Sequence, residues 1–293
     1  MIEFGENKYG GLGYNNIKNI DRPTFLNFPP ALTMNAKFNT IIIDFNNHVW
    51  VTGNNKYGQL GLGVTQDFIN IPTQIPNFKT KQVVTGNFTL FIDLNDNVWT
   101  VGNNFYGQLG LGDKEYRQTL TMIPDLKAKQ VHTGSEHSII IDFDNNIWVC
   151  GQGQNGQLGL GDSEDKLVPT VIPELKAKQV SVGARYTTII DLDDNIWVWG
   201  ENSEGQLGLG DDQERLVPTR IPELKARQIS TGNNHTLMID LDYNVWVWGE
   251  NESGQLGLGD NISRNISTRI PGFKVLQITG GLFHSMMIVT NLI

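Results

Sequence analysis

Several features that indicate common functions are scarce in this 293-residue sequence. It has a single cysteine, Cys150, which excludes an intrachain disulfide and favours a reducing compartment. The formal net charge is −9 and neither end is a run of Lys and Arg, so binding to nucleic acid is not expected. No apolar run reaches the roughly 18 residues of a membrane-spanning helix, and the start lacks a signal-peptide pattern. We therefore expect an intracellular protein, cytoplasmic or nuclear, with no membrane attachment.

One unit, written about six times, fills the chain. A decayed copy of this unit, YGGLGYN, has its first motif glycine at Gly10, 48 residues before the first full copy. Six periods of 49 residues make 294, against a length of 293, so residues 1–293 are predicted to be a single domain. The full motif GQLGLG begins, at steps of 49 residues, at Gly58, Gly107, Gly156, Gly205 and Gly254.

Each period contains four short runs with strand character and no helical stripe. In residues 228–276 these runs read QIST, HTLMID, NVWVWG and STRIP, and residues rich in Gly, Asn and Asp separate them. Four short strands in a period of about 45–50 residues are typical of a propeller blade. The sequence thus predicts an all-β fold, a six-bladed β-propeller built from four-stranded antiparallel blades.

The two ends predict how the ring closes. The N-terminal segment IEFG aligns with the third strand of the unit, and Arg22–Pro23–Thr24 aligns with the entry to the fourth. The C-terminal segments 277–279 and 284–289 supply the first and second strands. We expect one blade to take two strands from each end, which leaves no open edge between blades. The expected blades are residues 31–80, 81–128, 129–177, 178–226, 227–275, and 276–293 together with 1–30.

The combination WVWGENESGQLGLGD…STRIP…GLFHSMMI resembles the regulator of chromosome condensation 1 (RCC1) repeat family over the whole chain. The resemblance implies a β-propeller, and the better-known members have seven blades where six are predicted here. It also implies the activity of the founding member, guanine-nucleotide exchange on a small GTPase. That activity relies on an inserted wedge in one blade, whereas the blade lengths here are nearly uniform. The basic N-terminal arm that the family uses on chromatin is also missing.

Residues that recur in every blade are expected to serve folding, because every blade needs them. The motif glycines are expected at positive φ or where two backbones approach closely. The recurring third-strand tryptophans are assigned to the core, and they form no separate cluster of the kind that would sense light. This structural set comprises Gly58, Gly61, Gly63, Gly107, Gly156, Gly205, Gly254, Trp50, Trp99, Trp148, Trp197 and Trp246.

Two motifs imitate ligand sites. GQGQNG at 151–156 is a G-x-G-x-x-G after a strand, but a dinucleotide site also needs a following helix. D-x-D-x-N, as in Asp191–Asp193–Asn195, begins like an EF-hand loop but lacks that loop's glycine and bidentate glutamate. We expect a tight hairpin between the second and third strands instead. No cofactor and no metal are predicted.

The histidines do not indicate a metal site either. Three of them share one repeated position on different blades, where other blades have Asn, Phe or Tyr. A ligand position would not accept phenylalanine, so we expect this position to pack one blade against another. The residues at this position are Asn39, Phe88, His137, Tyr186, His235 and His284.

Function is expected in the loops that do not repeat. The loops after the first strand surround the predicted mouth of the central channel and differ from blade to blade. Their aromatic and charged residues would suit a single asymmetric partner. The opposite face carries the repeated LKAKQ lysines and the acidic hairpins, which are expected to compensate each other. The candidate interaction residues are Lys37, Phe38, Phe88, Glu136, Arg185, Tyr186, Asn234 and Phe283.

No nucleophile–base set, carboxylate pair or metal cluster stands out from the repeat, so the chain is not expected to be an enzyme. The predicted function is a non-enzymatic scaffold or adaptor that binds a protein partner as a monomer. The alternative is guanine-nucleotide exchange on a Ran-like small GTPase. Frequent Asn and Ile are typical of AT-rich genomes, which leaves open an origin in an amoeba or in a giant virus of amoebae. A viral origin would allow a place in the virion.

Overall fold

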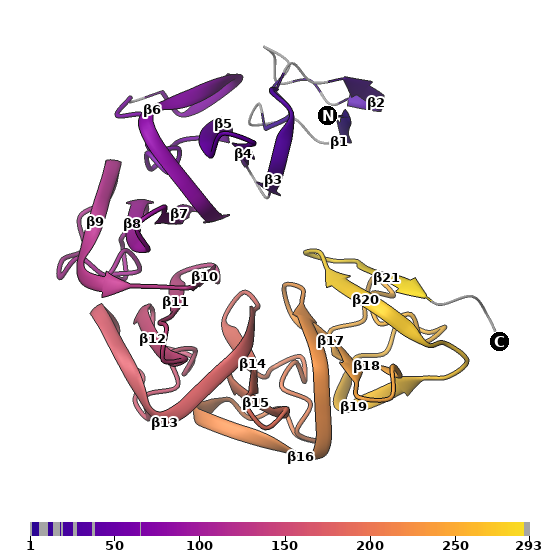
Figure 1. Cartoon of the computed structure of the whole chain (residues 1–293). Coiled ribbons are helices and arrows are strands. Elements are labelled where there is room, and N and C mark those ends of the chain that lie inside the picture. The colour runs from indigo at the N-terminus through magenta and orange to yellow at the C-terminus, as the bar shows by residue number, and fades with distance from the viewer. Residues whose placement is uncertain are drawn as a thin grey trace. The chain divides into compact units, whose positions relative to one another are not determined.

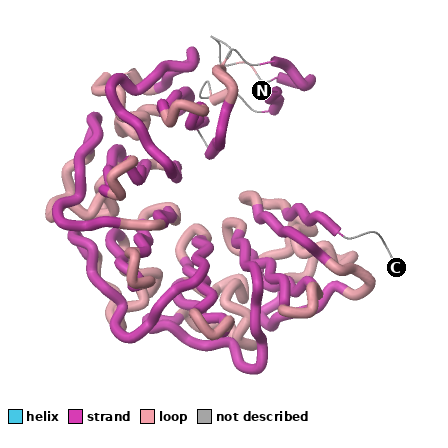
Figure 2. Tube along the Cα trace, viewed as in Figure 1, coloured by secondary structure: helices cyan, strands magenta, loops and turns pink. Residues whose placement is uncertain are grey.

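The computed structural model describes residues 2–5, 11–13, 18, 20–25, 28–36, 39–64 and 66–289. These residues form strands and turns and no helix, as the absence of a helical stripe predicts (Figures 1 and 2). Nothing in this part of the chain therefore forms a helix long and apolar enough to cross a membrane.

The chain divides into two compact units. The first comprises Met1–Thr133, Ser138–Phe143 and Lys166–Pro169, and the second comprises Gly134–His137, Asp144–Asp165 and Thr170–Ile293. Each unit is described by itself. The closure of residues 1–293 into one six-bladed ring stays a prediction.

Antiparallel strands in chain order build the first unit. Strands β3 to β9 hydrogen-bond each to the next, β10 pairs with β11, and β1 pairs with β2. Their bounds are β1 (Ile2–Gly5), β2 (Ile20–Phe25), β3 (Ala31–Ala36), β4 (Asn39–Asp44), β5 (His48–Asn54), β6 (Phe68–Thr85), β7 (Phe88–Asp93), β8 (Asn97–Gly102), β9 (Arg117–Lys127), β10 (Gln130–Thr133) and β11 (His137–Ile141).

The second unit has the same organisation. Strands β13 to β19 hydrogen-bond in chain order, and β20 pairs antiparallel with β21. The bounds are β12 (Asn146–Gly151), β13 (Lys166–Val182), β14 (Tyr186–Asp191), β15 (Asn195–Gly200), β16 (Arg215–Thr231), β17 (His235–Asp240), β18 (Val245–Gly249), β19 (Arg264–Ile270), β20 (Val275–Gly280) and β21 (Ser285–Val289).

The fourth strand of one blade continues into the first strand of the next. In β16, the first part pairs with β15 and the last part, from Ala226 to Thr231, pairs with β17. The sequence analysis predicted two separate short strands here. The joining segment stays extended, and the bend is placed on Glu223, whose φ is +60°. The equivalent residue Glu174 bends β13 in the same way, with φ +59°.

The first leucine of each GQLGLG motif lies in the core between blades. Leu207 is fully buried and belongs to one apolar cluster with Ile221 of β16 and Trp248 of the following blade. In the first unit, Leu60 packs in the same way beside Val101 of the following blade. The motif thus supplies a plug between adjacent blades, as its recurrence predicts.

The motif glycines have the positive φ that their recurrence predicts. The five that begin the motif have φ between +72° and +82°. At Gly58, an added Cβ would lie 2.5 Å from the Cα of Gln118 in the next blade, so glycine is needed for the close approach as well as for φ.

Candidate interaction face

The D-x-D-x-N segments form hairpin turns, which confirms the structural interpretation of this motif. Between β14 and β15, Asp191 Oδ1 accepts the backbone N–H groups of Asp193 and Asn195, both at 2.9 Å. Its Oδ2 accepts the indole N–H of Trp197 at 2.8 Å. Both carboxylate oxygens are therefore used inside the hairpin. Among the described residues, no group of three His, Cys, Asp or Glu side chains is placed to hold a metal ion.

These hydrogen bonds also govern the protonation of the hairpin carboxylates. Partial burial alone would raise the pKa of Asp191, but the bonds from Trp197 and Asn195 outweigh it and hold the pKa below 3.8. Asp240, the equivalent residue in the next blade, is shifted in the same direction for the same reasons. The hairpin aspartates are thus structural anions.

The core assignment of the recurring tryptophans needs correction. All five are only half-buried: Trp50, Trp99, Trp148, Trp197 and Trp246. Of these, Trp50, Trp99 and Trp246 pack against the core from its edge. Fully buried tryptophans occur two residues further along the strand, at Trp199 and Trp248. Because the half-buried position must present its indole N–H to the hairpin aspartate, the ring stays at the margin of the core.

The repeated lysines on the hairpin side are engaged within their own blades. Lys127 donates to the carbonyl of Asn95 at 2.7 Å, and Lys225 donates to that of Asp193 at 2.8 Å. Lys178 forms an ion pair with Asp194 at 2.6 Å. This agrees with the expected compensation of basic and acidic groups, so these lysines do not form a free basic surface.

The repeated histidine position packs blades together, as predicted. Tyr186 donates its hydroxyl to the carbonyl of His235 in the next blade at 2.6 Å, and burial raises its pKa. His235 in turn lies 3.0 Å, measured from Nε2, from the hydroxyl of Ser285 in the blade after that. Burial lowers the pKa of His235 to about 4, so the ring is neutral at pH 7.

The same packing overturns two of the predicted interaction residues. Phe88 and Tyr186 have no exposed surface, so neither side chain is available to a partner. Both are predicted to have two roles, packing between blades and contact with a partner. They begin the second strand, where side chains pack against the next blade, so only the packing role agrees with the structure. Lys37 and Phe38 lie outside the described residues.

Four other predicted residues keep some access to solvent. Arg185 and Phe283 are exposed, and Glu136 and Asn234 are half-buried. Arg185 lies 3.7 Å from the carboxylate of Glu201, and Asn234 donates to a glutamate of its own blade. These residues remain candidates for contact with a partner.

Backbone hydrogen bonds place two sets of loops on one face of each blade. The N–H of Glu201, which follows the third strand, donates to the carbonyl of Arg185, which follows the first, at 3.0 Å. In the first unit, Asn103 donates to Asn87 in the same way at 3.1 Å. The loops between the third and fourth strands therefore belong to the same face as the predicted loops.

On this face the first unit carries aromatic side chains that the sequence analysis missed. Phe105 is 71% exposed and Tyr116 is 57% exposed. The rings of Tyr106 and Phe105 are tilted by 52° to each other with centroids 6.2 Å apart, and Tyr57 is half-buried. We call Tyr57, Phe105, Tyr106 and Tyr116 the aromatic loop patch.

Specific contacts hold the members of the patch near one another. The side chain of Asn104 donates to the carbonyl of Glu115 at 3.0 Å, which ties the loop of Phe105 to that of Tyr116. The close approach of Gly58 to Arg117 and Gln118 brings the neighbouring Tyr57 to the same place. The patch thus spans two consecutive blades on a braced backbone.

The repeat itself contains the signal that would have found this patch. In the fourth blade, Ser203, Glu204 and Glu214 occupy the positions of Phe105, Tyr106 and Tyr116. Glu204 lies among other acidic groups, and partial burial, followed by the charges of Glu250 and its neighbours, raises its pKa. The equivalent loops are therefore aromatic in the first unit and acidic in the second.

The blades consist of four antiparallel strands each. A leucine plug and a continuous strand, which is the fourth strand of one blade and the first of the next, join consecutive blades. These features define a β-propeller. A profile of the regulator of chromosome condensation (RCC1) repeat matches residues 46–91, 95–141, 144–190, 193–239 and 243–288. A second profile of the same repeat matches residues 128–157, 177–206 and 226–255. The chain belongs to the RCC1 repeat family.

Solved structures share this fold at low sequence identity. Human WBSCR16 is 22% identical with a TM-score of 0.86, over 100% of this chain and 81% of that one. Yeast RCC1 (Prp20), bound to Kap60, is 21% identical with a TM-score of 0.84, over 98% and 76%. Prp20p from Saccharomyces cerevisiae, studied for its binding to Gsp1p and histones, is 18% identical with a TM-score of 0.70, over 100% and 91%. No curated protein sequence matches significantly.

Proposed function

We propose that this chain is a non-enzymatic scaffold that binds an intracellular protein partner through the loop face of its blades. The observation that carries the proposal is the aromatic loop patch. The described motif loops share one backbone pattern, and the second blade has the exposed aromatics Phe105 and Tyr116 where the fourth blade has Ser203 and Glu214. Tyr and Phe are enriched at protein interfaces, and a braced backbone lowers the entropy that binding costs.

The fourth blade offers substitutions that test the patch without disturbing the fold. Phe105→Ser with Tyr116→Glu places on the second blade the residues that the fourth blade has at these positions. The control is Phe45→Ser, because Phe45 is 67% exposed but lies in a hairpin between second and third strands. We expect the double variant to lose partners that the wild type and the control both retain in quantitative affinity capture. Identical partner sets for all three proteins would contradict the proposal.

Arg185 and Phe283 provide a second test, in the equivalent loops of the second unit. A protein carrying Arg185→Glu and Phe283→Ala is expected to lose or weaken the same partners. If only the aromatic variant loses them, the interface is confined to the first unit.

Guanine-nucleotide exchange on a Ran-like GTPase is the second candidate function. Membership of the RCC1 family favours it, as does the likeness to Prp20p, whose binding to Gsp1p has been studied. Four connections from third to fourth strand are equal in length, running from Gly102, Gly151, Gly200 and Gly249 to residues 117, 166, 215 and 264, so none of them carries an inserted wedge. A fluorescent-nucleotide release assay against Ran-like GTPases separates the two functions, because strong acceleration would contradict a pure scaffold.

A further inference from the structure

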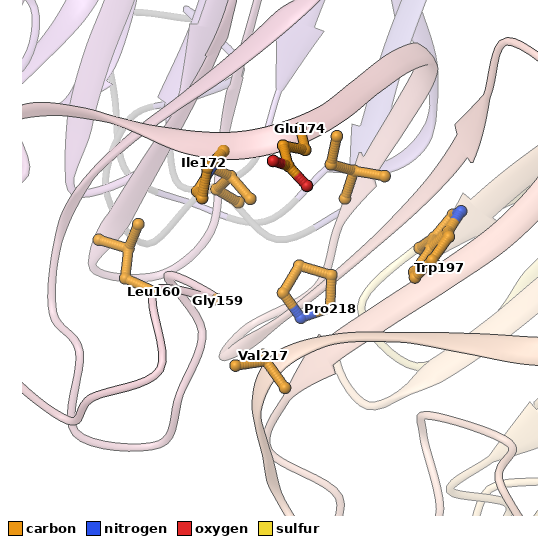
Figure 3. Close-up of a pocket in the computed structure, with 9 residues that line it drawn as sticks. Gly159, Leu160, Ile172, Glu174, Trp197, Val217 and Pro218 are labelled. Carbon is orange, nitrogen blue, oxygen red and sulfur yellow. The ribbon is translucent and has the colours of Figure 1, made fainter.

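An apolar pocket of about 380 Å³ lies in the second unit, on the outer side of two consecutive blades (Figure 3). This volume is within the range of roughly 300–1,000 Å³ that ligand sites occupy. Its walls come from a motif loop and from the outer strands β13 and β16, with one tryptophan of β15. The side chains that form it include Leu160, Ile172, Glu174, Trp197, Val217 and Pro218.

The bonding between blades differs at this seam from that at two other seams. Isolated antiparallel bridges join Leu62 to Thr119 and Leu209 to Ile266, which link a motif loop to the next outer strand. One bond of the second bridge is donated by Gly210 to Asn265 at 2.7 Å. An antiparallel bridge has two bonds, so the other donor is the N–H of the residue after Ile266.

That residue is Ser267, whereas the pocket has Pro218 at the same position. Gly161 still donates to the carbonyl of Leu216 at 2.8 Å, which is the first bond of the bridge. Pro218 has no N–H and so cannot donate the second. At this position the motif loop is therefore joined to β16 by one of the two backbone hydrogen bonds of the bridge. The pocket lies beside the proline.

The pocket is preformed. Trp197 donates its indole N–H to Asp191, and this hydrogen bond holds the ring in place as a fixed apolar wall of the pocket. The positive φ of Glu174 turns the chain at the mouth, and Figure 3 shows its carboxylate directed toward the same space. Glu174 is exposed and has no ion pair in the described part of the chain.

The chemistry of the walls selects the ligand. An aliphatic side chain would gain apolar contact with Leu160, Val217 and Trp197, while Glu174 is the only charged side chain on the lining. Because the walls offer so few polar groups, the ligand's own polar part must stay in water at the mouth. A cationic neighbour would meet Glu174 there. We propose that this seam pocket binds a partner peptide in which Lys or Arg follows a bulky aliphatic residue.

Methyl NMR of the full chain tests the proposal with two matched probes, N-acetyl-leucyl-lysine amide and N-acetyl-leucyl-glutamate amide. We expect the lysine probe to shift the methyl signals of Leu160, Ile172 and Val217 saturably, with a Kd on the order of 1 mM for so small a ligand. The glutamate probe should bind at least about fivefold more weakly, because it meets Glu174 with like charge. The absence of a saturable shift with the lysine probe would overturn the proposal.

Two reciprocal variants test the role of the proline. Pro218→Ser restores the missing N–H and should remove the response to the lysine probe. Ser267→Pro should create a response in the methyls of Leu209 and Ile266, for which no response is expected in the wild type. Proline already occupies this position at Pro169 and Pro218, so the fold tolerates it. Unchanged binding in Pro218→Ser, with methyl signals elsewhere intact, would contradict the mechanism.

Glu174→Gln tests the charge preference alone, since it retains the size of the side chain. It should make the lysine and glutamate probes bind alike while the methyls of the apolar walls still respond. A retained preference for the lysine probe would show that Glu174 does not recognise the cation.

Discussion

A Cβ added at Gly205 would lie 2.4 Å from the Cα of Asn265, a backbone atom of the next blade. Gly210, five residues further along the same motif loop, has a similar positive φ but nothing within 4 Å of an added Cβ. The two positions thus separate the cost of backbone conformation from the cost of a clash between blades.

We predict that Gly205→Ala destabilises the protein more than Gly210→Ala. Both substitutions cost about 1 kcal/mol for a positive φ. Only Gly205→Ala also forces two blades apart, which adds roughly 1–3 kcal/mol. Urea unfolding measures both variants against the wild type. Equal losses would show that the close approach between blades contributes nothing.

The two tryptophan positions of the third strand should respond differently to truncation. Trp199 is fully buried, and its indole N–H donates to the carbonyl of Gln157 at 2.9 Å. We expect Trp199→Ala to cost about 3–5 kcal/mol, the value for a buried aromatic. Trp197→Ala should cost less, because that ring is half-buried. The reverse order in denaturant titrations would contradict the corrected core assignment.

Asp191 should make stability depend on acid pH. Its pKa lies below 3.8 in the folded chain, so the unfolded chain takes up the proton first as the pH falls. The stabilisation is therefore complete above pH 3.8 and is lost as the pH falls through the folded pKa. Asp191→Ala should lower the free energy of unfolding at pH 7 by about 1–2 kcal/mol. The stability of this variant should also depend less on pH in the acid range. Asp193→Ala is the control, because the exposed Asp193 supplies only a backbone donor to the turn.

His235 should contribute a pH dependence in a different window. Its pKa is lowered to about 4, below its ordinary value of 6.5, so the unfolded chain binds the proton first between these values. Stability should fall as the pH drops from 6.5 to 4, by roughly 1–3 kcal/mol for this residue. His235→Tyr copies Tyr186 of the preceding blade and should remove this component of the curve. A wild-type curve identical to that of the variant would contradict the burial of a neutral ring.

Repetition made most of the fold predictable, because a residue such as Gly58 that recurs in every blade must serve every blade. The hairpins, the leucine plug and the inter-blade role of His235 all follow from that reasoning. Repetition does not say on which side of a strand a varying residue lies. Phe88 and Tyr186 occupy the repeated position of His235 but also vary like loop residues, and they are buried because they already belong to the second strand.

The aromatic loop patch was missed for the opposite reason. Its loops contain the GQLGLG motif, and that motif directs attention to folding. Phe105 stands just before the motif, and Tyr116 stands just after it, where Asn104 braces the two halves. A comparison of these flanking positions across blades identifies Phe105 as an aromatic aligned with Gln154, Ser203 and Glu252.

The strand β16, which leaves one blade and enters the next without a break, has a consequence for how such chains change in length. The repeat that matches residues 193–239 begins in the hairpin of one blade and ends with the second strand of the next. This matched repeat is therefore out of phase with the structural blade. When one such period is duplicated or lost, the first two strands of one blade are joined to the third and fourth strands of an equivalent blade. Unequal recombination can then alter the number of blades, while the blade at each junction remains a complete four-stranded sheet with its leucine plug.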